Sequence, residues 1–176
     1  FYSNIPSQVS PTPTPTPQMA PTAMPFPLTP KVLQGWGQNY PYKEDVRSTW
    51  QNVPPNQVAN LMGQESSFDP TIYNINTQPK NIVGHAPATR QEWANLRSQY
   101  PSIDTSLLQL STQPAVNDYM ASKGLTYYDL FSQPKLALQI AYDLYSGKIP
   151  YTKPGWGNWS ASIEQFPEEI RKLYPY

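Results

Sequence analysis

The sequence has no cysteine, a single histidine and no net charge, and each shortage removes a class of function. Without cysteine the chain forms no disulfide, has no thiol nucleophile and offers no thiolate ligand to a metal. The single histidine, His85, excludes a metal site built from several histidines. Twelve Lys+Arg balance twelve Asp+Glu, so the charge balance does not favour nucleic acid as a partner. We therefore expect no metal, no cofactor and no nucleic acid.

Long apolar runs are also missing, as are runs of alternating apolar and polar residues. A membrane-spanning helix needs about 20 predominantly apolar residues, so no membrane span is expected. The lack of alternation argues against long strands and favours a mainly helical fold. Because the first residue is Phe1 rather than Met, we expect a processed or excised product whose signal peptide, if any, has been removed.

Proline is abundant and is concentrated at the front of the chain. Residues 1–30 contain the run Pro11-Thr12-Pro13-Thr14-Pro15-Thr16-Pro17 and four later prolines, Pro21, Pro25, Pro27 and Pro30. This composition favours polyproline II and cannot build a packed core. We interpret residues 1–30 as a disordered Pro/Thr-rich linker with a reach of about 90 Å at about 3.1 Å per residue. It would tether the following domain to a virion or a larger polypeptide; a terminus without specific function is the alternative.

Residues 31–176 have the composition of one globular, mainly helical domain. A proline at a first-turn position predicts a helix beginning at Pro55 and stopped by Pro70. Further helices are predicted over residues 89–99 and between Ser132 and Gly147. Between them we expect an irregular stretch over 71–81 and short segments over 105–110 and 115–123, the last closed by Gly124. A final helical piece over 160–174 is interrupted at Pro167.

Glu65 occupies an unusual position in the first predicted helix. Val58, Leu61 and Met62 follow the i, i+3, i+4 spacing of an apolar face, and Glu65 falls at i+7 on the same face. Apolar surroundings disfavour the ionised carboxylate and raise its pKa, as a general acid near neutral pH requires. The alternative is a side chain that extends to water or pairs with an arginine.

Three stretches of the sequence, in order, resemble the lysozyme-like lytic transglycosylases of the soluble lytic transglycosylase and goose-type lysozyme superfamily. Gln64-Glu65-Ser66-Ser67-Phe68-Asp69-Pro70 is similar to the family's catalytic motif, in which a helix-terminal Glu precedes a Ser, an aromatic residue and a polar-Pro pair. Pro87-Ala88-Thr89-Arg90-Gln91-Glu92-Trp93 resembles a second stretch. The third comprises residues 137–145 with Gly155-Trp156-Gly157-Asn158-Trp159-Ser160. Together they cover about residues 52–160.

The resemblance has one departure. The family carries a Gly, an aliphatic or aromatic pair and a Gln that lines the sugar cleft, ahead of the Pro-Ala-Thr stretch. This chain instead has Val83-Gly84-His85-Ala86-Pro87, which is shorter and lacks the Gln. Positioning of the substrate through that residue is therefore in question.

The resemblance implies a lysozyme-like helical domain that acts on peptidoglycan glycan strands, at the β-1,4 bond between N-acetylmuramic acid and N-acetylglucosamine. Glu65 would act as acid and then as base. The alternatives are a muramidase that uses water, and a noncatalytic virion or cell-wall protein that retains the fold. A hydrolase would need a second carboxylate, and spacing does not rank the candidates Asp69, Glu92, Asp104, Asp118, Asp129 and Asp143. The implied location is extracellular, periplasmic or virion-associated.

Five further residues are implied as substrate contacts, and each has a structural alternative. Ser66 would brace the Glu65 carboxylate or simply terminate the helix. Tyr142 and Tyr145 would face the acid or pack in the core. Trp156 and Trp159 would stack on sugar rings or lock the C-terminal segment onto the core.

Overall fold

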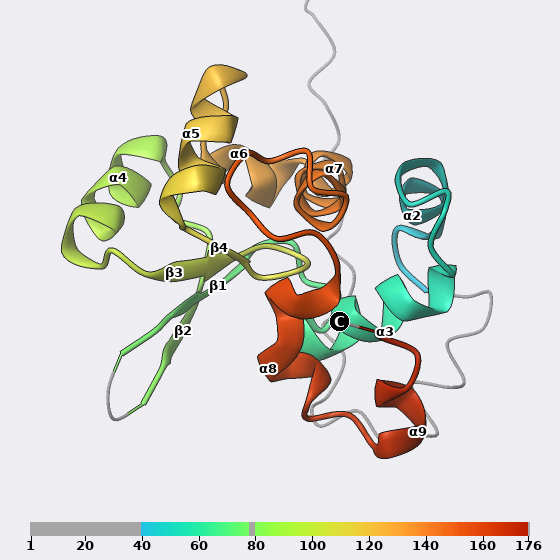
Figure 1. Ribbon diagram of the computed structural model, residues 1–176. Helices are drawn as coiled ribbons and strands as arrows, with labels where there is room; N and C mark the ends of the chain where they lie inside the picture. Colours follow the sequence, from blue (N-terminus) through green and yellow to red (C-terminus); the bar gives the residue numbers. More distant parts are fainter. Residues whose placement is uncertain (1–39, 78–79, 176) are drawn as a thin grey trace, which may run out of the picture.

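The computed structural model describes residues 40–77 and 80–175 of the 176-residue chain. The predicted linker over residues 1–30 lies outside these ranges. Within them, helix α3 (Pro55–Ser66) has a central place, with a small sheet on one side and helix α2 (Lys43–Thr49) on the other (Figure 1). Within the described ranges, no helix has both the length and the apolar character that crossing a bilayer requires.

About half of the described residues are helical, and a small four-stranded sheet accompanies the helices. After α2 and α3 the helices are α4 (Arg90–Gln99), α5 (Pro114–Ser122), α6 (Tyr127–Ser132), α7 (Pro134–Tyr145), the 3-10 helix η1 (Trp156–Trp159), α8 (Ser160–Ile163) and α9 (Glu168–Arg171). Local sequence signals explain where several of these helices begin or end. Thr89 and Glu92 form a reciprocal capping box at the start of α4, and Gly124, with φ +69°, follows α5 where a left-handed residue ends the helix. The predictions for α3, α4, α5 and α7 are confirmed.

A small sheet, which the sequence did not predict, accompanies the helices. It consists of β1 (Ile72–Ile75), β2 (Ile82–His85), β3 (Ile103–Thr105) and β4 (Leu110–Ser111), all antiparallel, in the order β2-β1-β3-β4. The stretch predicted as irregular over 71–81 thus contains β1, and the segment 105–110 belongs to the β3–β4 hairpin. Strands of two to four residues are too short for the two-residue period to repeat, so their pairing is set by the tertiary fold.

A cluster of aromatic rings forms the core between α2, α7 and η1. The Trp50 ring, 1% exposed, stacks on Trp156 with 5.7 Å between centroids and an interplanar angle of 11°. Trp159, Tyr142 and Tyr145 surround the same ring at centroid distances of 6.5, 5.4 and 5.3 Å. The Trp50 indole also donates a hydrogen bond of 3.1 Å to the backbone carbonyl of Leu138 in α7. We refer to these five rings as the Trp50 cluster.

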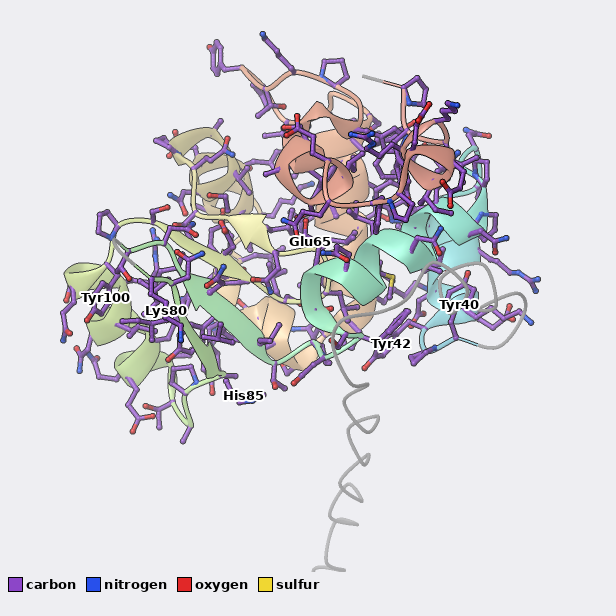
Figure 2. All side chains as sticks on the ribbon, turned by 90° about the horizontal axis from the view of Figure 1, so that it is seen from below. Tyr40, Tyr42, Glu65, Lys80, His85 and Tyr100 are labelled. Atoms are coloured by element: carbon purple, nitrogen blue, oxygen red, sulfur yellow. The ribbon has the colours of Figure 1, made fainter. Side chains whose placement is uncertain are left out.

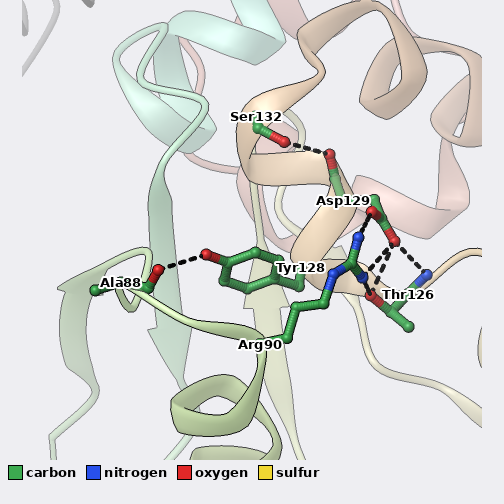
Figure 3. A network of polar contacts seen from close by, with 6 residues as sticks. All are labelled: Ala88, Arg90, Thr126, Tyr128, Asp129 and Ser132. Carbon is green, nitrogen blue, oxygen red and sulfur yellow. Dashed lines mark hydrogen bonds and ion pairs between the residues drawn. The ribbon is translucent and has the colours of Figure 1, made fainter.

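A polar network joins the start of α4 to α6 on the sheet side of the molecule (Figure 3). The guanidinium of Arg90 pairs with the carboxylate of Asp129, which also accepts hydrogen bonds from the backbone and hydroxyl of Thr126. The hydrogen bond from Arg90 is the main cause that lowers the pKa of Asp129. Tyr128 lies under the same guanidinium and donates a 2.9 Å hydrogen bond to the carbonyl of Ala88. The stretch 87–93, one of the three that resemble the family, therefore joins the start of α4 to α6.

Candidate active site

Glu65 lies in the last turn of α3, and the residues after it end the helix abruptly. Ser67 and Phe68 both have left-handed backbone conformations, with φ of 52° and 64°. Their amides donate to the carbonyls of Gly63 and Met62, at 3.1 and 3.5 Å, in the manner of a helix C-terminus. The Phe68 ring is buried. The motif after Glu65 thus turns the chain sharply into the sheet and leaves Glu65 at the junction.

A pocket of about 280 Å³ opens at this junction, and Glu65 lines it. Its walls come from α3, the β3–β4 hairpin, the end of α7, η1 and α8; Figure 2 shows Glu65 between α3, the sheet and the C-terminal helices. Most of its polar side chains are uncharged: Asn76, Gln109, Ser111, Gln113, Asn158, Ser160 and Ser162. Its apolar surface comes from Leu110, Leu144, Trp159 and Ala161. We call this space the Glu65 pocket.

Burial makes Glu65 a weak acid. Desolvation raises its pKa from 4.5 to about 8, opposed by a hydrogen bond from the Ser162 side chain and reinforced by the negative charge of Asp104. At neutral pH the carboxyl group is therefore mostly protonated and is a proton donor. This is the environment that the apolar stripe of α3 predicts for residue 65.

Asp104, on β3, is the second carboxylate of the Glu65 pocket. Burial raises its pKa as well, and hydrogen bonds from the Asn76 and Ser111 side chains oppose the shift. The amide of Asn76 donates to Asp104 at 2.9 Å. Of the six carboxylates that spacing left unranked, Asp104 is the one that lines this pocket. No cluster of three or more His, Asp or Glu side chains suited to a metal ion occurs in residues 40–77 and 80–175.

Gln109 is a pocket residue that sequence reasoning missed. It ends the stretch Ser106-Leu107-Leu108-Gln109, which has the order of the expected Gly, aliphatic pair and Gln, with serine in place of glycine. Ser106 has φ +66°, a conformation that glycine adopts most easily. The requirement for glycine hid this similarity, and the stretch before Pro87 contributes no residue to the pocket. Gly84 and His85 there belong to strand β2, which does not line the pocket.

The turn that carries Gln109 is held from both sides. The Ser66 hydroxyl donates to the carbonyl of Leu107 at 2.9 Å, and the Trp159 indole donates to the carbonyl of Leu108 at 2.7 Å. The Gln109 amide donates to the carbonyl of Ser106 at 2.9 Å, which leaves its own oxygen as an acceptor. Helix α3, the β3–β4 hairpin and η1 are thus fixed relative to one another.

Of the five substrate contacts expected from the resemblance, Trp159 alone lines the Glu65 pocket. The Ser66 hydroxyl is buried and donates to the carbonyls of Met62 and Leu107, so it braces the backbone instead of the carboxylate. Trp156 is buried in the Trp50 cluster, and Tyr142 and Tyr145 pack against the same ring. For Tyr142, Tyr145 and Trp156 the structure supports the packing alternative, because the Trp50 ring provides a large apolar surface that they cover.

The partly buried, desolvated carboxyl group of Glu65 should make the stability of the fold depend on pH. The folded protein keeps the Glu65 proton up to about pH 8, whereas the unfolded chain releases it near 4.5. Between these values the unfolded state binds fewer protons, so the contribution of Glu65 to stability is lost as pH rises, by at most about 1.4 kcal/mol per pH unit. Glu65→Gln removes this dependence. We expect the variant to be more stable than the parent at pH 8, by on the order of 2–4 kcal/mol.

Urea unfolding of parent and variant from pH 4 to 9 measures this difference. Glu169→Gln, at an exposed position of α9, is the matched control and should follow the parent. Parallel pH profiles for the parent and Glu65→Gln would show that residue 65 ionises normally in the folded protein.

Comparisons with known proteins do not add to this description. The chain matches no family model, no curated protein and no solved structure. The chemistry of the pocket therefore has to support any functional assignment.

Proposed function

We propose that this chain is a peptidoglycan lytic transglycosylase that cleaves the β-1,4 bond between N-acetylmuramic acid and N-acetylglucosamine. One observation carries the proposal: Glu65 has a pKa of about 8 and lines a pocket of mainly uncharged hydrogen-bonding groups. The resemblance of residues 64–70 to the family's catalytic motif directs the choice of substrate. A lysozyme-like fold, and action outside the cytoplasmic membrane or on a virion with attachment through residues 1–30, form part of the same proposal.

The first chemical step needs a proton donor. Cleavage of a glycosidic bond develops an oxocarbenium-like centre while the leaving oxygen takes a proton. A carboxyl group that is protonated at pH 7 can supply that proton, and a pKa near the working pH makes the transfer efficient in both directions. The partly apolar walls of the pocket, including Leu144 and Trp159, maintain the neutral form until the substrate reacts.

The second step needs a base, and the same residue can serve. After donating its proton, the Glu65 carboxylate accepts the proton of the C6 hydroxyl of the muramic acid, whose oxygen then closes a 1,6-anhydro ring. No water is consumed, and one carboxylate is sufficient. The Ser162 hydroxyl stabilises the carboxylate in this state, because its hydrogen bond favours the ionised form.

The rest of the pocket suits a sugar. Gln109 and Asn158 use their amide protons on backbone carbonyls, so each offers its oxygen to a hydroxyl or acetamide N–H of the substrate. Ser111, Ser160 and Ser162 add hydroxyl groups, and Trp159, which is 4% exposed, forms part of the wall. Gln109 also places a glutamine in the pocket, and this supports the enzyme over the noncatalytic alternative, whose principal argument was a missing cleft glutamine.

A muramidase that hydrolyses the same bond is the second candidate, and Asp104 favours it. Hydrolysis employs a second carboxylate that activates water or stabilises the reacting centre, and Asp104 lies in the pocket with Glu65. The raised pKa of Asp104 follows mainly from burial. The two candidates differ in whether water is consumed.

Digestion of purified murein by the chain, followed by mass spectrometry of the soluble products, tests the proposal. We expect muropeptides with anhydromuramic ends, which weigh one water less than products with reducing ends. Products with reducing ends would replace the transglycosylase with the muramidase. If no soluble fragments are released, neither enzyme is supported and the proposed function is rejected.

A further inference from the structure

A second, larger space of about 640 Å³ lies next to the Glu65 pocket, and we call it the outer compartment. The two spaces share Gln113, Asn158 and Ser160 in their walls, so they are adjacent, and we refer to the two together as the groove. The outer wall is the loop between α7 and η1, which passes beside the start of α5 (Figure 1). Asn158 holds this loop by donating to the carbonyls of Lys153 and Gly155, at 2.9 and 3.1 Å.

The outer compartment differs from the Glu65 pocket in its charges. It is lined by a cation, Lys153, and an anion, Glu164, and both residues are exposed. Neither forms an ion pair within the described part of the chain. A neutral sugar makes no use of two opposite charges, whereas a short peptide that carries carboxylates and an amine complements both.

The exposure and backbone conformation of Tyr151 are a second indication of a ligand in the outer compartment. Its side chain is fully exposed, and its backbone has φ +63°, which costs a residue with a side chain some conformational energy. The fold does not bury the ring, so packing does not explain a tyrosine at this position. The ring is available to a ligand that occupies the outer compartment.

We propose that the outer compartment binds the peptide stem of peptidoglycan while the sugar of the same unit occupies the Glu65 pocket. The stem is attached to the lactyl group of muramic acid, so a muramyl residue beside Glu65 would place it within a few ångströms of the reacting bond. Lys153 would pair with a stem carboxylate, and Glu164 would pair with the amine of a diamino acid. This inference rests on the proposed function for its choice of substrate, and it makes the chain selective for peptide-bearing glycan.

Calorimetric titration of the full chain with two soluble probes tests the inference. One probe is the disaccharide of N-acetylglucosamine and N-acetylmuramic acid that carries an alanyl-glutamyl-diamino acid peptide. The other is the same disaccharide with its lactyl carboxyl capped as a methylamide. We expect the peptide-bearing probe to bind about tenfold more tightly, as two exposed charge pairs together would produce. In Lys153→Gln this preference should fall to about threefold, because the contact of Glu164 with the amine remains.

Lys135→Gln, at an exposed position of α7 outside the groove, is the matched control and should keep the full preference. Equal binding of the two probes, binding of neither probe, or an unchanged preference in Lys153→Gln would overturn the inference. Its failure is distinguishable from failure of the proposed function. Cleavage of murein with equal binding rejects the peptide site alone, whereas peptide-dependent binding without cleavage rejects the enzyme and retains the site.

Discussion

Replacement of Glu65 by glutamine is expected to reduce murein cleavage by about 10²- to 10⁴-fold, which is the usual contribution of general acid and base catalysis. Glutamine has nearly the same shape and can keep a hydrogen bond to Ser162, but it has no proton to donate to the leaving oxygen. The folded structure should persist, because the variant relieves the burial of an ionisable group. Release of soluble muropeptides per unit time is the measurement.

The activity of the parent chain should also depend on pH, because Glu65 has to be protonated to act as the acid. The acid form of Glu65 is lost as pH rises through about 8, so the rate should fall above that value. Glu169→Gln serves as the control for the loss of one exposed carboxylate and should retain parental activity. A Glu65→Gln protein that clears murein at the parental rate would remove residue 65 from the mechanism.

Replacement of Trp50 by alanine is expected to destabilise the fold by about 3–5 kcal/mol, which is the range for truncating a buried aromatic side chain. The ring is 1% exposed and contacts four other aromatic rings from α7 and η1. Truncation would leave a cavity and would break the hydrogen bond to the Leu138 carbonyl. The free energy of urea unfolding measures the loss.

Two further variants test whether the loss of stability comes from the lost packing of a buried ring. Trp50→Phe keeps much of the ring but loses the indole N–H, so we expect a smaller loss than for alanine. Tyr151→Ala removes an aromatic ring that is fully exposed, and it should change stability by about 0.5 kcal/mol or less. Unfolding of Trp50→Ala at the parental urea concentration would show that the cluster does not stabilise the fold.

Helices with strong local signals could be predicted from the sequence. The capping box of Thr89 and Glu92 marks the start of α4, and Gly124 marks the end of α5. These signals act within one or two turns, so no distant residue is needed to interpret them. Helices α2 and α6, with seven and six residues, were not predicted, because helices this short are stabilised mainly by packing.

The candidate site was only partly predictable. Glu65 could be found because its neighbours on the apolar face of α3 belong to the same helix. Asp104 could not be assigned to the pocket, because it reaches it through a hairpin about 40 residues further along the chain. Gln109 was missed because serine, not glycine, begins its four-residue stretch. Tyr142, Tyr145 and Trp156 were expected in the site but do not line it. They pack against Trp50, which is distant in the sequence.

The amino-acid sequence alone determined the main helices and the unusual position of one carboxyl group on an apolar face, since both follow from spacings of three or four residues. The tertiary structure decided which groups surround that carboxyl group, which rings form the core, and which space, lined by Lys153, lies next to the Glu65 pocket. The physical reason is that desolvation and charge depend on neighbours in space, and these neighbours come from α3, the β3–β4 hairpin, α7 and α8. Tertiary packing brings these segments together, and no local sequence pattern predicts that packing.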